Sequence, residues 1–315
     1  MNLHNNKEIF KELITKTANH MNIEAIAMVE KDYYVTYFLS EIAKKQPDII
    51  FKGGTSLSKC HKIINRFSED VDLSVEPKTD KVTESQRRKL KKDILEIIEE
   101  SGFTLENPED VRSRRDFNRY NINFHSSIEQ DYLDKNLIVE TSVFIKTFPN
   151  ETKNVSSMVY DFLVSTNANN TIEEYGLKPF QMTVQALERT FADKVFAIAD
   201  YFMRKENAER LSRHVYDLYK IKSQISFNED FVKLVKEVRE VRKPWKLCVS
   251  AQDGVDIQSV LKKIVSEDYY KQDYEQITQN MLFEDVPYSK AITVISDIIK
   301  AGIFKQLQKS KAEEL

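Results

Sequence analysis

The chain has 315 residues, of which 41% are hydrophobic and 31% are charged, and its formal net charge is -3. A chain of this length can bury a substantial core and most often forms two domains. No stretch is long and apolar enough to span a membrane, and residues 1–20 lack the basic start and apolar core of a signal peptide. These features predict a cytoplasmic protein with no membrane partner.

The two cysteines, Cys60 and Cys248, stand apart without the spacing of metal ligands. This argues against a zinc site and against a disulfide scaffold, and both thiols are expected to be packing residues. The net negative charge gives no general attraction to nucleic acid, so any RNA contact has to come from a local basic surface.

In chain order, residues 1–46 are predicted to be mostly helical, and Ile49 to Phe51 to end a strand. Gly53 and Gly54 permit a tight turn, after which a helix is predicted over 57–64, beginning at residue 55 or 56. Free backbone N–H groups and the positive end of the helix dipole favour an anion at that point. The absence of a Cβ on both glycines lets a phosphate approach closely.

The segment from Asp70 to Val75 alternates polar and apolar residues, which predicts a strand with Asp70 and Asp72 on one face. Two carboxylates about 4 Å apart repel by about 4 kcal/mol at an effective dielectric constant of 20. A divalent cation turns that repulsion into attraction. Mg²⁺, which takes carboxylate and phosphate oxygens, is the expected ion.

Each motif alone has a commoner structural explanation, because Gly-Gly-Thr is usually only a turn and Asp-X-Asp is usually a solvated strand edge. Here a strand, a Gly-Gly-Thr-Ser turn and an Asp-X-Asp strand follow one another within residues 49–75. Chance rarely produces that order, and the combination predicts metal-dependent nucleotide chemistry.

Lys52-Gly-Gly-Thr-Ser-Leu-Ser-Lys59, followed by Arg66-Phe-Ser68-Glu-Asp70-Val-Asp72-Leu73, resembles the DNA polymerase beta-like nucleotidyltransferases, and more closely their AbiEii/AbiGii toxin branch. The resemblance covers about residues 20–225, including the segments 29–34, 188–194 and 213–218. One departure is that His214-Val215 stands where the branch commonly has Asp-Leu, so only Asp217 carries over from that motif.

The resemblance implies an α+β protein, with a polymerase-beta-like nucleotidyltransferase lobe on a mixed or antiparallel sheet and a mainly helical C-terminal lobe. It implies an enzyme with two Mg²⁺ ions, Mn²⁺ being the alternative, that moves a nucleotide from an NTP to an acceptor hydroxyl. Several members act on the 3′ end of tRNA. The implied role is the toxin of a type IV toxin-antitoxin or phage-defence pair, with the antitoxin encoded nearby. Nucleotide transfer to a protein or small molecule, and a catalytically silent nucleotide-binding module, are the alternatives.

A site of this kind normally has a third carboxylate on a neighbouring strand. Glu140 fits, because it lies with Ser142 opposite the apolar side of a strand predicted within 137–145. It is expected to ligate a metal and to orient or deprotonate the attacking hydroxyl, the alternative being an exposed glutamate on a one-sided sheet. Asp131 and Asp134 compete with it but sit in a turn-like stretch.

Lys194 falls in the apolar stripe of a helix predicted from Val184 to about Met203, where an ammonium is costly unless it reaches an anion. We assign it to the β- or γ-phosphate of the NTP, the alternative being that its stem packs while its charge reaches water. Asp217, in the stripe of a later helix, needs a partner, for which Lys194 or a nucleotide hydroxyl is available.

Besides Lys194, the residues expected to bind the nucleotide are Gly53, Gly54, Thr55, Ser56, Lys59, Arg66 and Ser68. Arg210 and Arg213 are further candidates for phosphate or acceptor contacts, whereas His214 is expected to be a packed or surface residue. Lys31 and Asp32 are expected to form an ion pair that holds the N-terminal helices.

Two basic stretches are candidates for an RNA-binding surface. For each of them an ordinary solvated surface explains the charge equally well. They are residues 87–92 and the group Arg112, Arg114, Arg115 and Arg119, the latter with Phe117 and Tyr120 available for stacking.

The remaining pattern predicts strands near residues 48, 70, 120, 138 and 158, and a helix over 89–100 that stops at Gly102. Gly176 to Pro179 marks a boundary between a nucleotidyltransferase domain, 1–178, and a helical domain, 179–315. Helices are predicted from Thr183 onward, including 231–241, 255–265 and 289–300. The active site is expected to lie between two groups of side chains. Asp70, Asp72 and Glu140 form the first group, and Lys194 and Asp217 form the second.

Overall fold

The structure is a computed structural model that describes residues 2–68, 70–79, 81–128, 136–207 and 209–305. It divides into two compact units. The first, which we call the sheet unit, comprises Met1–Lys62 and Phe67–Gln185, and the second, the helical unit, comprises Ile63–Arg66 and Ala186–Leu315. Asp131 and Asp134 lie outside the described residues.

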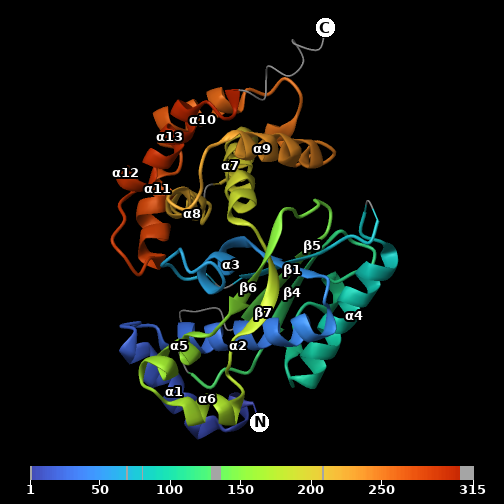
Figure 1. The fold of residues 1–315 in the computed structure, drawn as a ribbon, viewed down its shortest axis with the longest axis vertical. Helices are drawn as coiled ribbons and strands as arrows, with labels where there is room; N and C mark the ends of the chain where they lie inside the picture. The colour runs from blue at the N-terminus through green and yellow to red at the C-terminus, as the bar shows by residue number, and fades with distance from the viewer. Residues whose placement is uncertain (1, 69, 80, 129–135, 208, 306–315) are drawn as a thin grey trace. The chain divides into compact units, whose positions relative to one another are not determined.

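Within the described residues, the sheet unit contains one mixed sheet of seven strands in the order β3-β4-β5-β2-β1-β7-β6 (Figure 1). Strand β1 is antiparallel to β2 and parallel to β7, and β5 is parallel to β2 and antiparallel to β4. The strands are β1 (Ile49–Lys52), β2 (Asp70–Val75), β3 (Thr104–Leu105), β4 (Phe117–Asn123), β5 (Asn136–Ser142), β6 (Asn150–Val155) and β7 (Phe180–Gln185). The predicted mixed sheet and α+β class are confirmed.

The helices of the sheet unit are α1 (Lys7–His20), α2 (Ile26–Lys45), α3 (Gly53–Lys59), α4 (Glu84–Glu100), α5 (Met158–Ser165) and α6 (Asn169–Tyr175). Helix α4 begins earlier than its apolar pattern suggests because Thr83 and Gln86 form a capping box at its start. It stops before Gly102, whose φ of 68° suits the left-handed turn there. Helix α3 ends at Lys59, short of the predicted residue 64.

Side chains alternate across β2 and β5, so each of these two strands has a fully buried face and a face that carries partly exposed polar residues. Phe51, Val71, Leu73, Leu137 and Val139 are fully buried and share one core with apolar residues of α1, α2 and α4. Residues Asp70, Asp72 and Glu140 lie on the opposite face and are only partly buried. The helices therefore fix which face of the sheet is left to carry polar chemistry.

Two sequence predictions around residues 158 and 178 are wrong in detail. Residues near 158 form helix α5, capped by the Ser157 side chain, and the strand expected there is β6. The chain turns at Gly176, but β7 follows and pairs with β1 and β6, so the sheet unit runs to Gln185 rather than to residue 178. The apolar pattern of β7 cannot be told from a helix start by periodicity alone.

The helical unit is built around α7, which contacts α8, α9 and α10. Its helices are α7 (Leu187–Arg204), α8 (Arg213–Lys222), α9 (Glu229–Arg242), α10 (Ile257–Ser266), α11 (Lys271–Asp273), α12 (Tyr288–Ala291) and α13 (Thr293–Ala301). The helices predicted at 231–241, 255–265 and 289–300 are thus found as α9, α10 and the pair α12 and α13.

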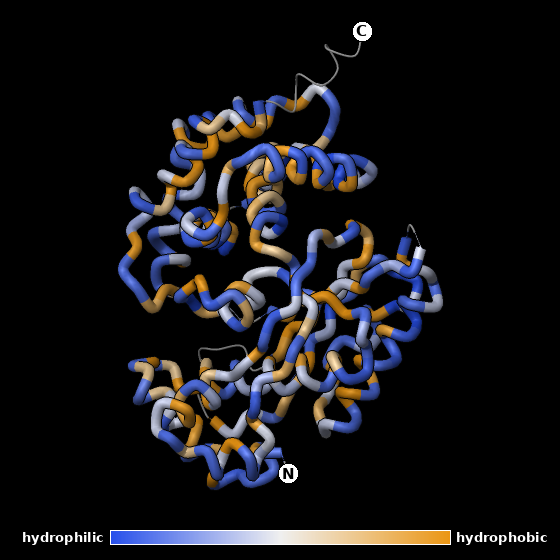
Figure 2. Tube along the Cα trace, viewed as in Figure 1, coloured by the Kyte–Doolittle hydropathy of each residue, from blue (hydrophilic) through white to orange (hydrophobic). Residues whose placement is uncertain are grey.

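Hydrophobic and hydrophilic residues alternate along the helices of both units (Figure 2). In the part of the chain that the structure describes, no helix combines the length and the apolar character needed to cross a bilayer.

Residues Ile63–Arg66 belong to the helical unit although they stand between two elements of the sheet unit in the sequence. The backbone N–H of Asn65 donates to the Tyr216 hydroxyl at 2.9 Å, and its carbonyl accepts from the N–H of Phe283 at 2.9 Å. Arg66 forms an isolated β-bridge with Leu282. This short segment is therefore held by backbone pairing as well as by its side chains.

Candidate active site

The turn between β1 and α3 brings a glycine directly against a carboxylate. Gly53 has a φ of 77°, a conformation that favours glycine, and a Cβ at this position would lie 1.9 Å from Oδ2 of Asp72. Lys52 is the residue of β1 that pairs with Asp72 of β2. The glycine is thus required twice, by its backbone conformation and by the carboxylate that lies over it.

The hydroxyl groups of the turn are used inside the sheet unit. Thr55 Oγ1 donates to the backbone carbonyl of Asp70 at 2.6 Å and lies 2.9 Å from Ser68 Oγ, and Ser56 Oγ donates to the carbonyl of Gly53 at 2.9 Å. Thr55 and Ser56 are fully buried. The Thr55 side chain therefore fixes the turn against the start of β2, and the Ser56 side chain braces the turn itself.

Asp70, Asp72 and Glu140 lie on one face of two adjacent strands. In the parallel ladder of β2 and β5, Asp72 is the direct partner of Glu140 and Asp70 is the partner of Ile138. Neighbouring strands are about 4.8 Å apart, so the Asp72 and Glu140 side chains leave the sheet side by side. The structure therefore brings the two predicted aspartates and the predicted glutamate onto one polar face.

The donor chemistry of this face fits a hard divalent cation, because it consists of carboxylate oxygens from adjacent positions. Within the described residues, however, no three His, Cys, Asp or Glu side chains are grouped closely enough to hold a metal ion. Glu140 is held instead by Arg119 of β4, whose Nη1 donates to Oε1 at 3.1 Å. Glu140 would have to turn away from Arg119 to complete a set of three ligands.

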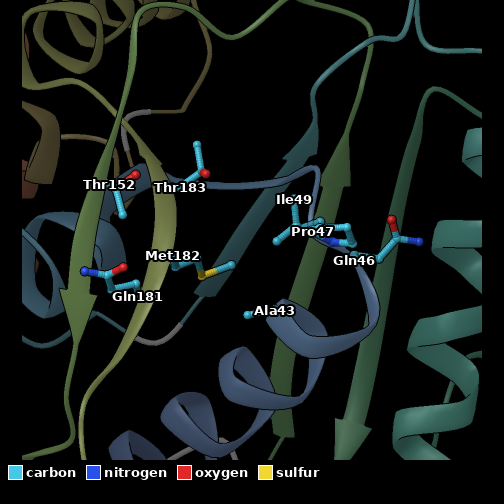
Figure 3. A pocket seen from close by; sticks show the side chains of 8 residues that line it. All are labelled: Ala43, Gln46, Pro47, Ile49, Thr152, Gln181, Met182 and Thr183. Atoms are coloured by element: carbon cyan, nitrogen blue, oxygen red, sulfur yellow. The ribbon is translucent and has the colours of Figure 1, made fainter.

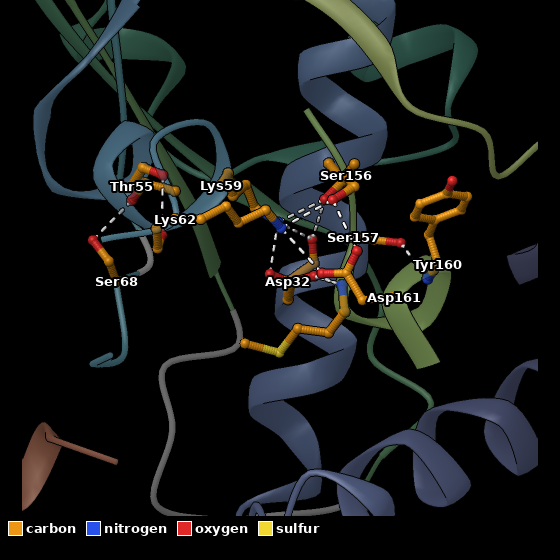
Figure 4. Close-up of polar contacts among 12 residues, drawn as sticks. Asp32, Thr55, Lys59, Lys62, Ser68, Ser156, Ser157, Tyr160 and Asp161 are labelled. Carbon is orange, nitrogen blue, oxygen red and sulfur yellow. Dashed lines mark hydrogen bonds and ion pairs between the residues drawn. The ribbon is translucent and has the colours of Figure 1, made fainter. Parts of the chain in front are cut away.

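Lys59 does not point its charge toward the turn. Its ammonium donates to Oδ1 of Asp32 at 2.6 Å and to Thr36 at 2.7 Å, and the Lys59 side chain is only 4% exposed (Figure 4). The second oxygen of Asp32 accepts from the backbone N–H of Met158, at the start of α5. This pair links α2, α3 and α5, so Asp32 does form a structural ion pair, with Lys59.

Arg66, Lys194 and Asp217 form a buried cluster within the helical unit. Asp217 accepts from Arg66 at both oxygens, with Nε at 2.7 Å and Nη2 at 2.8 Å, and from the Lys194 ammonium at 2.7 Å. All three side chains are almost completely buried. Lys194 is therefore a partner of Asp217, as the sequence allowed. Arg66 is a further partner, although the sequence assigned it only to phosphate binding.

The charges in this cluster shift the ionisation of its members. Burial alone would raise the pKa of Asp217, but Arg66 and Lys194 overcome that effect and hold the pKa far below its usual range. Burial lowers the pKa of Lys194, and Asp217 opposes that shift. His214, whose Nδ1 lies 3.3 Å from the Lys194 ammonium, has its pKa well below the usual value because of burial and the positive charges of Lys194 and Arg213.

A neutral His214 with Nδ1 unprotonated accepts a hydrogen bond from Lys194. Its ring lies parallel to that of Tyr201, at an interplanar angle of 16° and a centroid distance of 5.9 Å. His214 is thus a packed residue, as expected, and it also contacts the predicted phosphate-binding cation.

Several other charged residues of the helical unit are held by ion pairs or hydrogen bonds within that unit. Arg189 pairs with Asp193 at 2.9 Å, and Arg242 pairs with both Asp193 and Asp200. The backbone N–H of Arg210 donates to Asp273 at 2.7 Å, and Arg213 opens helix α8. Asp193 and Asp200 therefore join α7 to α9 through Arg242, and the pair with Asp200 is buried.

The predicted basic group is exposed at Arg112, Arg114 and Arg115, which precede β4, and at Arg119, which lies in β4. Tyr120 is 1% exposed and is not available for stacking, which corrects the sequence interpretation, whereas Phe117 is 44% exposed. The two differ because neighbouring residues of a strand face opposite sides of the sheet.

A pocket of about 230 Å³ lies at the starting end of β1, among residues that include Gln46, Ile49, Thr152 and Met182 (Figure 3). Its lining contains none of the predicted site residues. The carboxylates lie toward the other end of β1, where Lys52 pairs with Asp72.

The sequence did not reveal the Arg119 contact to Glu140 or the role of Lys59 as the partner of Asp32. Arg119 shares the β4 alternation with Phe117, which signals an exposed face, but no local pattern pairs it with Glu140. Long-range register and packing decide both contacts.

Residues 37–294 match the family model for the nucleotidyl transferase AbiEii toxin of type IV toxin-antitoxin systems. No curated protein matches the chain. Among solved structures, the chain is similar to MenT4, a nucleotidyltransferase toxin from Mycobacterium tuberculosis H37Rv, with 16% sequence identity and a TM-score of 0.48 over 93% of this chain and 89% of that one. The match to the family model spans most of the chain, which therefore belongs to the AbiEii family of nucleotidyltransferase toxins of type IV toxin-antitoxin systems.

Proposed function

We propose that this nucleotidyltransferase moves a nucleoside monophosphate from an NTP to the 3′ hydroxyl of an RNA, with tRNA as the foremost acceptor, and that Mg²⁺ supports the reaction. The observation that carries the proposal is the direct pairing of Asp72 with Glu140 across β2 and β5, with Asp70 on the same face. Acids in this arrangement suit a site where phosphate and hydroxyl oxygens gather around divalent cations.

In the proposed reaction, the acceptor hydroxyl oxygen bonds to the α-phosphorus while the bond from that phosphorus to the β-phosphate oxygen breaks. Pyrophosphate leaves, and the hydroxyl proton passes to Glu140 or to water. A bound divalent cation supplies neutralisation of the phosphate charge. Asp70 and Asp72 would hold that cation, and Glu140, once released by Arg119, would orient the hydroxyl.

The turn at Gly53 and Gly54, shaped by Thr55, Ser56 and Ser68, is proposed to face the triphosphate. Its contribution is a close approach of the backbone, because the hydroxyls of residues 55 and 56 are engaged within the turn. Within the helical unit, Lys194 is separately proposed as a β- or γ-phosphate contact, for which it would exchange part of its contact with Asp217 for phosphate oxygens. Arg66 then keeps Asp217 in place, since it holds both carboxylate oxygens.

The AbiEii family implies an NTP as substrate and an antitoxin as partner. We further propose that the antitoxin is encoded nearby, that the pair acts in phage defence, and that the toxin works in the cytoplasm. Each of these proposals extends the family assignment.

Incubation of the purified protein with each α-labelled NTP, Mg²⁺ and total RNA tests the reaction. The expected result is labelled RNA, with the label lost on chelation of the metal and in Asp72→Asn, whose melting temperature stays close to wild type. Asp161→Asn is the matched control, because Asp161 is a partly exposed acid outside the candidate site that pairs with Lys62. Label on protein or on a small molecule would replace the RNA acceptor, and the absence of any label would favour a silent nucleotide-binding module.

A further inference from the structure

Strand β4 presents an aromatic and a cationic side chain on its open face. Phe117 is 44% exposed, and Arg119, two residues on, is also exposed. Asn118, Tyr120 and Ile122, which alternate with them, are buried. Phe117 and Arg119 therefore share one face of the strand and stand next to each other along it.

This face is continuous with the carboxylates of the candidate site. Arg119 is the direct partner of Glu140 in the ladder of β4 and β5, and Phe117 is the partner of Ser142. Glu140 is in turn the partner of Asp72. Arg119, Glu140 and Asp72 thus form one row across three adjacent strands, and two strand spacings place Arg119 about 10 Å from Asp72.

The charge of the segment complements a phosphate chain. Residues 112–119 contain four arginines and one aspartate, whereas the whole chain has a net charge of -3. The Arg119 guanidinium contacts Asn121 at 3.3 Å and Glu140 at 3.1 Å. These contacts use two of its five N–H donors, and the side chain remains 48% exposed.

We propose that the open face of β4, formed by Phe117 and Arg119, binds the 3′-terminal nucleotides of a single-stranded RNA acceptor. A base stacks on the Phe117 ring and a backbone phosphate binds Arg119, which delivers the terminal hydroxyl along the row toward Glu140 and Asp72. This inference rests on the proposed function and adds the surface that receives the acceptor.

The chemistry selects single-stranded RNA over a duplex. A phenyl ring on an open sheet takes an unstacked base, and stacking tolerates any base because each has a π face. In a duplex the bases are already stacked and paired, so Phe117 gains nothing from them. The surface is therefore expected to recognise an unpaired 3′ end with little preference for its sequence.

The test measures binding of a short fluorescein-labelled single-stranded RNA with a free 3′ hydroxyl, by fluorescence anisotropy at several salt concentrations and without NTP. Phe117→Ala is expected to raise Kd about tenfold with an unchanged salt slope, because it removes one stacking contact. Arg119→Gln is expected to raise Kd and to reduce the salt slope by about 0.7, because it removes one phosphate contact. Phe117→Tyr should retain binding.

Two matched controls lie away from β4. Val164→Ala removes an apolar side chain that is 46% exposed, and Lys178→Gln breaks an exposed ion pair with Glu173. Both should leave Kd within about twofold of wild type. Equal effects of the β4 variants and these controls, or equally tight binding of a blunt duplex, would overturn the inference.

Labelling of the same RNA by α-labelled NTP separates this inference from the proposed function. If wild type transfers nucleotide to RNA and Phe117→Ala and Arg119→Gln do so with unchanged KM for RNA, only the β4 surface is wrong. If wild type labels no RNA, the proposed acceptor fails and the surface fails with it.

Discussion

Oδ2 of Asp72 lies where a Cβ on Gly53 would have to be, with only 1.9 Å between the two positions. Gly53, which follows β1, and Asp72 of β2 are therefore packed so closely that no side chain can stand at position 53 unless the carboxylate moves. This relationship explains why the glycine of the turn matters for the carboxylate as well as for phosphate approach.

Gly53→Ala is expected to reduce nucleotide transfer at least about 100-fold, because the new methyl group displaces the Asp72 carboxylate and small displacements of reacting groups have effects of this size. The left-handed backbone adds a loss of about 1 kcal/mol in the free energy of unfolding. Labelled-nucleotide transfer and chemical denaturation measure the two effects.

Gly254→Ala is the matched control, because Gly254 has a similar φ of 81° and a Cβ added there would meet no heavy atom within 4 Å. It should lose similar stability and keep its activity. Equal activity of the two variants would contradict a functional role for the Gly53 and Asp72 contact.

Asp217→Asn is expected to lower the free energy of unfolding at pH 7 by about 3–5 kcal/mol, because it leaves Arg66 and Lys194 without their shared carboxylate. The low pKa of Asp217 in the folded protein means that its contribution is present above the pKa of an unfolded aspartate, about 3.9, and is lost as pH falls below it.

Urea denaturation from pH 7 down to pH 3 measures both effects. The variant should show a shallower acid decline than wild type, whereas Asp161→Asn, at a half-exposed pair, should change stability by less than about 0.5 kcal/mol. An acid decline that Asp217→Asn leaves unchanged would show that this cluster does not govern acid stability.

Lys59→Met is expected to lower the free energy of unfolding by about 3–5 kcal/mol, because it leaves the Asp32 carboxylate without its ammonium partner in a nearly buried position. The double change Asp32→Asn with Lys59→Met should recover part of the loss, since it removes the stranded charge. Thermal or chemical denaturation measures this.

Lys62→Met provides the control, because Lys62 pairs with Asp161 at 3.0 Å but is half exposed (Figure 4). It should have little effect on stability. If Lys59→Met leaves stability unchanged and instead raises KM for NTP, the phosphate role predicted from the sequence is correct and the structural role is wrong.

His214→Asp restores the residue type common in the family at this position and is expected to raise KM for NTP about tenfold. The added carboxylate stands near Lys194 and competes with the phosphate for its ammonium, whereas the neutral imidazole only accepts a hydrogen bond. A charge pair at about 4 Å is worth up to about 4 kcal/mol at an effective dielectric constant of 20. A tenfold change in KM needs only about 1.4 kcal/mol of that energy.

Steady-state kinetics with varied NTP measures this change, and His214→Asn, which keeps an uncharged acceptor, should stay close to wild type. Identical KM values for the aspartate and asparagine variants would show that Lys194 does not bind a phosphate of the NTP.

Local patterns in the sequence were sufficient for many elements and for the faces of the central strands. The alternation from Asp70 to Val75 placed both aspartates on one side of β2, and the pattern around Glu140 placed that acid on the open face of β5. The same reasoning failed near residue 158 and at β7, where short apolar segments suit a strand and a helix equally well.

The sequence also identified ionisable residues in the apolar stripes of helices. Such a residue needs a partner of opposite charge, because an unpaired charge among apolar side chains is costly. Lys194 and Asp217 were both identified in this way, and they are 2.7 Å apart. The sequence did not reveal that Arg66, from the segment before β2, holds the same carboxylate, because no local pattern relates it to α8.

The sequence by itself therefore determined the family motif, the alternation that selects the open face, and the residues whose charge needs compensation. Only the tertiary structure decided that Glu140 stands beside Asp72, that Arg119 holds Glu140, and that Lys59 serves Asp32. The physical reason is that periodicity is a property of one segment, whereas strand order, register and ion pairing depend on how distant segments bury their apolar faces together.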